Sequence, residues 1–123
     1  MKHIGNLLFS LFILLLSSCA VSKPEYTAEK KYSPKQLKED IRLMEKMLKK
    51  NHPSLYWYAS PAQIDSAFQR AYSLANDSMD ERQFRNLLSE TVNPVQCGHT
   101  SIRFSKKYNS YVAKHRPSAF PLG

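Results

Sequence analysis

Apolar residues recur three and four positions apart in three stretches of the chain, a pattern typical of helices that bury one face. The first predicted helix ends near Asn51, because Pro53 restricts the residue before it and cannot extend the helix. The third ends before Pro94. The residues expected on the buried faces are Leu37, Ile41, Met44 and Leu48 in the first helix, Ile64, Ala67, Phe68, Ala71 and Ala75 in the second, and Phe84, Leu87, Leu88 and Thr91 in the third.

Each predicted helix begins with the same short signal, a serine followed three residues later by glutamine or glutamate. In such a capping box the serine oxygen accepts from the backbone N–H three residues on, and the longer side chain reaches back. The first two serines are also followed by proline, which is favoured at the first position of a helix. The three pairs are Ser33 and Gln36, Ser60 and Gln63, and Ser78 and Glu81.

Beyond His99 the apolar pattern changes to strict alternation, which predicts a strand over residues 100–104. A second short strand is predicted over residues 111–113, after a polar turn. A single hairpin is marginal in water, so these strands are expected to join a sheet whose remaining strands are not in this chain. The predicted fold class is α+β and mainly helical, with a three-helix N-terminal bundle followed by one or two strands of an incomplete sheet.

The N-terminus has the pattern of an export signal. Lys2 is followed by an apolar run over residues 7–16, broken only by Ser10, and this run is much shorter than the roughly 20 residues needed to cross a bilayer. The sequence Leu-Ser-Ser-Cys that ends at Cys19 resembles a bacterial lipobox. In lipoproteins of that kind the signal is cut before the cysteine and the thiol carries lipid. An ordinary signal peptide with a chance cysteine is the alternative.

The lipobox resemblance implies an exported lipoprotein, anchored through Cys19 to the outer membrane or to the periplasmic face of a membrane. Residues 1–18 are then the signal peptide, and residues 19–32 form a tether of mixed charge. The helical domain spans residues 33–94, and a β-containing region begins in residues 95–123. Without the signal, 105 of the 123 residues remain, enough for one small domain.

The chain carries 18 Lys and Arg residues against 10 Asp and Glu residues, a formal net charge of +8. Such a balance raises the question of nucleic acid in a cytoplasmic protein, but an exported lipoprotein rarely meets DNA. The lysines between positions 30 and 50 are spread along the first helix and the segment before it, which favours a solvated face. Attraction to an anionic membrane surface is the alternative, and no nucleic-acid partner is expected.

Cys97 has no disulfide partner once Cys19 carries lipid. A buried thiol that packs like a small hydrophobic group is the expected state, and a reactive thiol is the alternative. Cys97 and His99 also form half of a possible metal site, to which His52 or His115 could be added. Structural zinc sites show paired ligands in both halves, and the sequence offers no second pair, so neither a metal nor a cofactor is expected.

Three aromatic residues in a row, Tyr56, Trp57 and Tyr58, follow the first helix. We expect them to form a packing lid across the helices. Binding of a peptide or contact with a membrane interface is the alternative. His52, which precedes Pro53, is expected to end the first helix rather than to take part in catalysis.

His99 lies where the third helix gives way to the alternating segment, beside Gly98. Histidine is the usual base that activates a weak nucleophile, because its pKa lies near neutrality. Glycine permits close approach of the backbone. From the residues alone, His99 is either a general base or a structural residue at the corner between the third helix and the next segment.

The segment 52–56 reads His-Pro-Ser-Leu-Tyr, and the segment 97–100 reads Cys-Gly-His-Thr. In this order, and with helices between them, they resemble the N-terminal region of S41-family serine peptidases, the group that includes tail-specific and tricorn-like proteases. Many exported lipoproteins of this group also begin with a lipobox and a basic tether. The similarity spans residues 33–104, and its specific parts are the two short segments.

The S41 resemblance implies that His99 is the general base for a serine that lies far downstream. In tricorn the residue before this histidine is an assisting serine, a role that Gly98 cannot fill. Other members have aspartate where this chain has Cys97. In the family the nucleophile, its supporting acid and most of the sheet follow the Gly-His-Thr segment. The serines that follow His99 do not match the family's nucleophile setting; they are Ser101, Ser105, Ser110 and Ser118.

The chain is therefore expected to be the N-terminal part of a lipid-anchored S41-like serine peptidase, inactive as this fragment, with residues 95–123 as the truncated start of the peptidase core. Its expected partners are the membrane, through the anchor at Cys19, and an exported protein or peptide substrate once the chain is completed. The alternative is a small non-catalytic helical lipoprotein with a binding or scaffolding role at the membrane.

Overall fold

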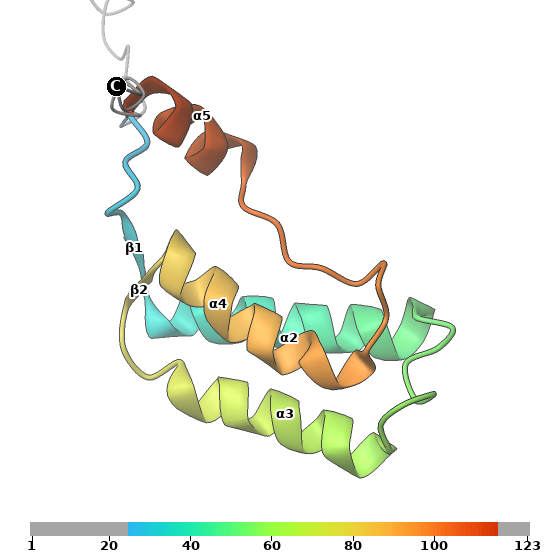
Figure 1. Ribbon diagram of the computed structural model, residues 1–123. Coiled ribbons are helices and arrows are strands. Elements are labelled where there is room, and N and C mark those ends of the chain that lie inside the picture. Colours follow the sequence, from blue (N-terminus) through green and yellow to red (C-terminus); the bar gives the residue numbers. More distant parts are fainter. Residues whose placement is uncertain (1–24, 116–123) are drawn as a thin grey trace, which may run out of the picture.

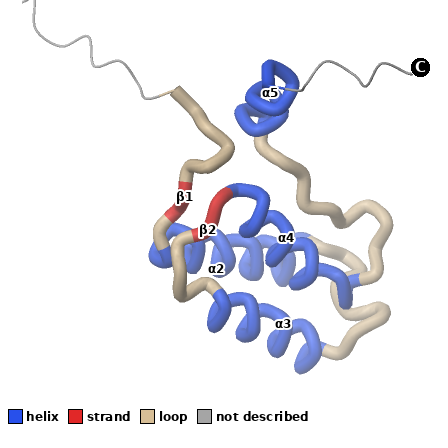
Figure 2. Tube along the Cα trace, turned by 60° about the vertical axis from the view of Figure 1, so that its left-hand side comes forward, coloured by secondary structure: helices blue, strands red, loops and turns tan. Residues whose placement is uncertain are grey.

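Three helices pack together into the body of the protein, and a fourth lies apart from them (Figures 1 and 2). The computed structural model describes residues 25–115. The α+β, mainly helical class predicted from the sequence is confirmed. In chain order the elements are β1 (Lys31–Tyr32), α2 (Pro34–Asn51), α3 (Pro61–Leu74), β2 (Met79–Asp80), α4 (Glu81–Val92), the single 3₁₀ turn η1 (Asn93–Val95) and α5 (Lys106–His115).

The first two capping boxes form as predicted. The backbone N–H of Ser33 donates to Gln36 Oε1 (3.0 Å), and Gln36 N–H donates back to Ser33 Oγ (3.5 Å). Ser60 and Gln63 make the same pair of hydrogen bonds at the start of α3. A cap of this kind stabilises a helix by about 1 kcal/mol.

The third capping box was predicted two residues too early. Asp80, not Ser78, caps α4: Gln83 N–H donates to Asp80 Oδ1 (2.8 Å), and Asp80 N–H donates to Gln83 Oε1 (3.0 Å). Both pairs have the spacing of a capping box, so the pattern alone did not separate them. Aspartate has the advantage of a negative charge at the positive end of the helix dipole.

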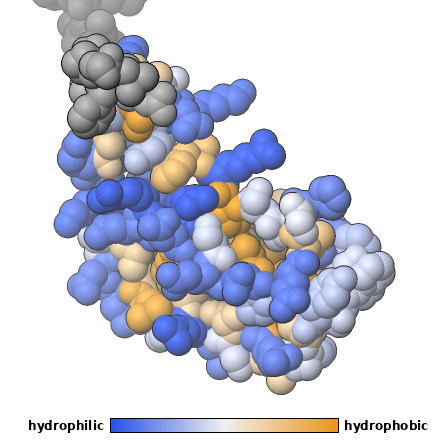
Figure 3. Space-filling view, viewed as in Figure 1, coloured by the Kyte–Doolittle hydropathy of each residue, from blue (hydrophilic) through white to orange (hydrophobic). Residues whose placement is uncertain are grey.

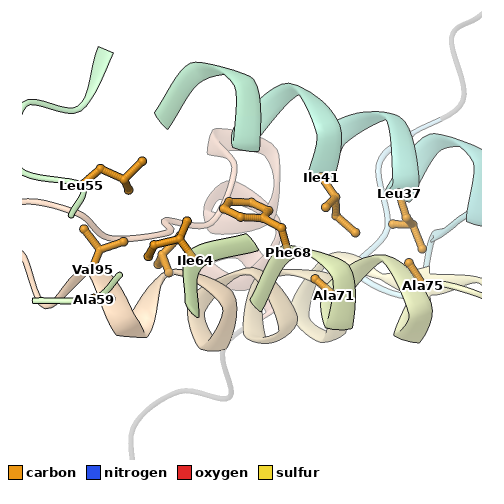
Figure 4. Packing of buried hydrophobic residues seen from close by; sticks show 10 residues of the cluster. Leu37, Ile41, Leu55, Ala59, Ile64, Phe68, Ala71, Ala75 and Val95 are labelled. Atoms are coloured by element: carbon orange, nitrogen blue, oxygen red, sulfur yellow. The ribbon is translucent and has the colours of Figure 1, made fainter. Parts of the chain in front are cut away.

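The core lies on the face of α3 that meets α2 and α4. Ala71 and Ala75 are small, and this lets α2 come close enough for Leu37 and Ile41 to pack against them (Figure 4). The predicted faces of the three helices meet at this cluster, although Phe84, Leu87 and Leu88 of α4 are only partly buried against it. Its buried members are Leu37, Ile41, Leu55, Ala59, Ile64, Phe68, Ala71, Ala75, Val92 and Val95.

The only sheet within residues 25–115 was not predicted. β1 pairs antiparallel with β2, with Lys31 opposite Asp80 and Tyr32 opposite Met79. Lys31 and Tyr32 were expected at the end of the tether. The pairing instead attaches this segment to the start of α4.

The strand predicted over residues 100–104 was wrong. This segment is irregular and pairs with no strand in the described part of the chain. Ile102 is half-buried and turned toward the helices, where its carbonyl accepts from Arg85 Nε (3.1 Å). Figure 3 shows apolar side chains in the middle of this face of the molecule, below the connection as Figure 1 draws it. The alternation of apolar and polar residues therefore reflects which side chains of this segment face the helices. It does not indicate a strand.

The second predicted strand, residues 111–113, was also wrong, because it lies inside α5. Ser105 begins this helix by accepting from Tyr108 N–H at its side-chain oxygen (3.1 Å). Tyr111 then stacks on His115, one turn later, with ring centroids 4.1 Å apart. No residue of α5 is buried; the helix is held at its start by Ser105, and farther along Tyr111 contacts the Tyr26 ring and donates to Glu29 Oε2 (3.4 Å).

Glu81 holds both arms of the chain against the body. One oxygen, Oε2, accepts from the hydroxyls of Tyr26 (2.6 Å) and Ser105 (2.8 Å). The other, Oε1, accepts from the backbone N–H of Ser105 (2.6 Å). Burial and the hydrogen bond to Glu81 raise the pKa of the Tyr26 phenol. The segment before β1 and the start of α5 therefore share one carboxylate.

The predicted aromatic lid does not form. Tyr56, Trp57 and Tyr58 are 45%, 74% and 62% exposed, whereas Leu55 and Ala59 on either side are 2% and 6% exposed. The two smaller residues fill the space that the lid was expected to cover, so the aromatic rings are left in solvent. No helix within residues 25–115 is both long and apolar enough to cross a bilayer.

We predict that Glu81→Ala detaches α5 without unfolding the body. Hydrogen bonds to a charged group contribute about 1.5–3 kcal/mol, and Glu81 is half-buried, so the lower end of that range applies. Amide exchange in α5 should become roughly tenfold faster, while exchange in α3 stays nearly unchanged. Glu90→Ala, an exposed site on the same helix, is the control. Unchanged exchange in α5, or an equal effect of the control, contradicts the prediction.

Candidate functional site

The Cys97–Thr100 segment forms a tight turn just after α4. Val95, in η1, is buried in the core. Gln96 adopts a left-handed conformation (φ 49°, ψ 28°) and is the only non-glycine residue between 25 and 115 with a positive φ. Thr100 N–H then donates to the carbonyl of Cys97 (2.9 Å). The turn is thus fixed on its N-terminal side by a buried residue.

His52 fixes the other side of the turn. As predicted, it ends the first helix: its backbone N–H donates to the carbonyl of Leu48 (2.9 Å). Its imidazole also reaches the turn, with Nε2 2.8 Å from Thr100 Oγ1. Nδ1 accepts from the backbone N–H of Ser54 (3.2 Å). A ring that accepts at Nδ1 carries its proton on Nε2, so His52 donates to the Thr100 hydroxyl.

The hydrogen bonds continue from Thr100 to Cys97. Hydrogen bonds lower the pKa of the Cys97 thiol below its usual value. The largest effect comes from the backbone N–H of His99 and the next from the hydroxyl of Thr100. The thiol is only half-buried, so the expected buried cysteine was wrong. These donors favour the thiolate, the reactive form of cysteine.

A hollow of about 420 Å³ lies next to the turn. Arg85 and Ser89 of α4 line one side, and Cys97, Thr100 and Ile102 are among the residues on the other. The guanidinium of Arg85 is held in place by the carbonyl of Ile102, and it lies 5.0 Å from the ring centre of Phe104. Cys97 opens into this hollow, whereas His99 is not among its lining residues.

His99, the predicted general base, is exposed. Within residues 25–115 its imidazole makes no hydrogen bond to a serine or to an acidic side chain. The described serines that follow it are Ser101, Ser105 and Ser110, of which Ser105 is engaged by Glu81 and Ser110 lies in α5. The structure therefore presents an imidazole at the surface of a turn but forms no base–nucleophile pair in the described part of the chain.

Gly98 is not needed for close packing. A Cβ at this position would meet no atom within 4 Å, and its φ is not positive. The expectation that this glycine allows a close backbone approach is therefore wrong for the fold. Any requirement for glycine here would come from a molecule that binds to the turn.

His115 does not join Cys97 and His99 in a cluster of possible metal ligands. His115 lies in α5 and donates from Nδ1 to the carbonyl of Tyr111 (2.8 Å). Among the residues that the structure describes, no three His, Cys, Asp or Glu side chains come together as they would around a metal ion. The predicted lipidation site, Cys19, lies outside the described residues.

The contact between His52 and Thr100 was missed by the sequence analysis. The two residues are 48 positions apart, and His52 was assigned only to the end of the helix. A signal was present, because His52 and Thr100 each belong to one of the two segments that carry the S41 resemblance.

No family model, no curated protein and no solved structure matches this chain. The resemblance to S41 peptidases and the lipid anchor at Cys19 therefore stay predictions. The local geometry of the turn is the basis on which a function can be proposed.

We predict that Gly98→Ala raises the free energy of unfolding by about 0.4–1 kcal/mol, because alanine restricts the unfolded chain and meets no obstacle in the folded one. Urea unfolding followed by circular dichroism measures this. A loss of stability would show that a neighbour closes over Gly98.

We also predict that Cys97 reacts with iodoacetamide at lower pH in the folded chain than in the urea-unfolded chain. A lowered thiol pKa means that the thiolate forms earlier as the pH rises. Thr100→Val removes one donor and should shift the pH midpoint upward, toward the unfolded value. Mass spectrometry of the Cys97 peptide separates its reaction from that of Cys19, and Ser101→Ala is the control. Equal midpoints in folded and unfolded chains contradict the prediction.

Proposed function

We propose that this chain supplies the N-terminal, base-bearing region of a lipid-anchored S41-like serine peptidase that acts on exported proteins or peptides. The observation that supports this most directly is the hydrogen bond between His52 and Thr100. It joins the two segments that carry the resemblance, which lie 48 residues apart. Their contact places the two matching segments in one part of the fold, as a shared site requires.

In this proposal, His99 is the general base. Its turn is held by Val95 and Gln96 on one side and by Thr100 on the other, so the position of the backbone is well determined. The imidazole itself is exposed and has no described partner. A serine brought against it could lose its proton to the ring, which is how a weak hydroxyl nucleophile is activated.

Acyl transfer also requires a nucleophile, oxyanion donors and a substrate groove. Residues 25–115 do not assemble these groups around His99. The proposal therefore requires that they come from protein outside the described residues. Purified as the 123-residue chain, the protein is expected to be catalytically silent.

A second candidate is a non-catalytic helical lipoprotein that binds a partner at the membrane. The observation in its favour is the exposure of Tyr56, Trp57 and Tyr58, since three adjacent exposed aromatic side chains are typical of binding surfaces. This candidate assigns no chemistry to His99, and the two proposals therefore differ in what mutation of that residue does.

We predict that cells carrying an epitope tag within residues 20–24 of this chain contain a fluorophosphonate-labelled species that bears the tag or co-purifies with it. His99→Ala should reduce the labelling by about 100-fold or more, because loss of a general base costs about 10²–10⁴ in rate. His115→Ala is the control, since this histidine lies in α5. Labelling is measured on the tag-purified material.

The outcome separates the two candidates. Absence of any labelled species with the tag, or labelling that survives His99→Ala, contradicts the peptidase proposal and favours the binding protein. Labelling of the purified 123-residue chain would also contradict it, because it would place a nucleophile within this chain.

A further inference from the structure

The outward side of α2 carries an excess of positive charge. The helix has six basic and three acidic residues. Lys49 is paired with Glu45 and Asp65, at 2.6 Å each, and hydrogen bonds to Asp65 and Glu45 raise its pKa. Within residues 25–115 the other basic residues of α2 have no carboxylate at salt-bridge distance; they are Lys35, Lys38, Arg42, Lys46 and Lys50.

The helix periodicity places part of this charge on the outward side. The core stripe of α2 is marked by Leu37 and Ile41, and Lys35 and Lys46 fall on the opposite side of the helix at 100° per residue, together with the acidic Glu39. Arg42 is turned toward α3, where its guanidinium donates to the Tyr72 hydroxyl and lies 4.9 Å from the ring centre. Arg42, Lys46 and Lys50 border one shallow surface depression together with the Lys49–Glu45 ion pair. Two large apolar side chains on the flank of this surface are also exposed: Leu43 by 56% and Met47 by 55%.

The aromatic loop continues this surface at the C-terminal end of α2. Leu55 and Ala59 are buried and fix both ends of the loop, and Trp57 N–H donates to the carbonyl of Ser54 (3.2 Å). The rings of Tyr56, Trp57 and Tyr58 are therefore carried on a well-anchored, protruding loop. Exposed tryptophan and tyrosine next to lysine are characteristic of the water–lipid interface.

The segment that leads back to the predicted lipid site and the aromatic loop lie at opposite ends of α2. Figure 1 shows β1 beside the start of α2 and the aromatic loop beyond its end, and a helix of 18 residues is about 27 Å long. Cys19, the predicted lipid site, lies twelve residues before Lys31, a stretch that reaches at most about 40 Å. With α2 lying along a membrane surface, both the anchor and the loop reach it.

We propose that the outward face of α2 and the Tyr56–Tyr58 loop form a contact surface for a lipid bilayer rich in anionic headgroups. Lys35, Lys46 and Lys50 interact with the headgroups, and the aromatic rings sit at the level of the lipid interface. Each basic residue close to an anionic surface strengthens binding about fivefold. Basic residues spread along the length of a helix, with exposed aromatic rings beyond its end, suit the wide anionic surface of a bilayer.

Trp57 is the only tryptophan in the chain and is therefore a specific probe of this surface. The full chain is reconstituted with vesicles of phosphatidylcholine alone and with vesicles that also contain phosphatidylglycerol. Co-sedimentation measures how much of the chain each kind of vesicle holds, and the fluorescence of the bound chain reports on the loop. With anionic vesicles, Trp57 emission should move to shorter wavelength and resist quenching by acrylamide; with neutral vesicles, both should stay close to the values of an exposed side chain.

Charge-reversal variants test the role of α2. The triple variant Lys35→Glu, Lys46→Glu, Lys50→Glu should lower the ratio of docked to undocked loop by about 100-fold, because each lost lysine weakens binding about fivefold and the three effects multiply. The matched control is Arg70→Glu, Arg82→Glu, Lys107→Glu, which changes the net charge equally on other elements and should leave the ratio unchanged. Circular dichroism confirms that both variants are folded. Tyr56→Ser with Tyr58→Ser should reduce the shielding of Trp57 while the charge of α2 is kept.

The proposal is overturned if Trp57 is equally exposed to acrylamide with both kinds of vesicle, or if the two triple variants weaken docking equally. The first result would leave the loop as a surface for a protein partner. The proposal does not depend on peptidase activity, because the measurement involves no substrate and leaves His99 unchanged.

Discussion

Burial of the narrow apolar face of α3 is the interaction on which the rest of the structure depends. Phe68 fills the space between α2 and α4, while Ala71 and Ala75 let α2 approach closely at one end. At the other end the same cluster takes in Leu55, from the loop after α2, and Val95, from η1. Burying side chains of this size contributes about 1.5–3 kcal/mol each. Because Leu55 and Val95 share one cluster, the end of α2 and the turn after α4 are brought together, and the contact between His52 and Thr100 becomes possible.

A second, polar centre organises the parts that have no core of their own. α5 buries no side chain, and the segment before β1 is held mainly through β1 pairing and Tyr26. Glu81 connects both to the first turn of α4 by accepting three hydrogen bonds. A region held by few polar contacts opens locally far more easily than a packed core. The protein thus has a firmly packed body and two peripheral segments that meet it largely through polar contacts, with Glu81 as the side chain they share.

The sequence predicted those features that are set by neighbouring residues. Helix positions, two of the three caps and the end of α2 at His52 depend on spacing within a few residues, and these were found. Errors arose where a local pattern has two solutions. Ser78 and Asp80 both have the spacing of a capping box. Alternation over residues 100–104 fits either a strand or an irregular segment that lies against a helix. The aromatic loop was expected to pack across the helices, because the sequence does not show that Leu55 and Ala59 are the buried residues there. The link from His52 to Thr100 and the pairing of β1 with β2 are long-range, and only the packing of the helices brings them about.

His52 connects the candidate site to the proposed membrane surface. Its backbone ends α2, its ring holds Thr100, and the chain that follows it is the aromatic loop. The turn that carries His99 and the loop that carries Trp57 therefore share one point of attachment. If the loop rests on a bilayer, the orientation of the Cys97–Thr100 turn relative to that bilayer is fixed as well, because little freedom remains between His52 and Leu55, which is buried. A peptidase built on this arrangement would hold its base at a defined height above the membrane, where exported chains emerge. A binding protein built on it would use the same rigidity to present the turn, and the Cys97 thiol, at that height.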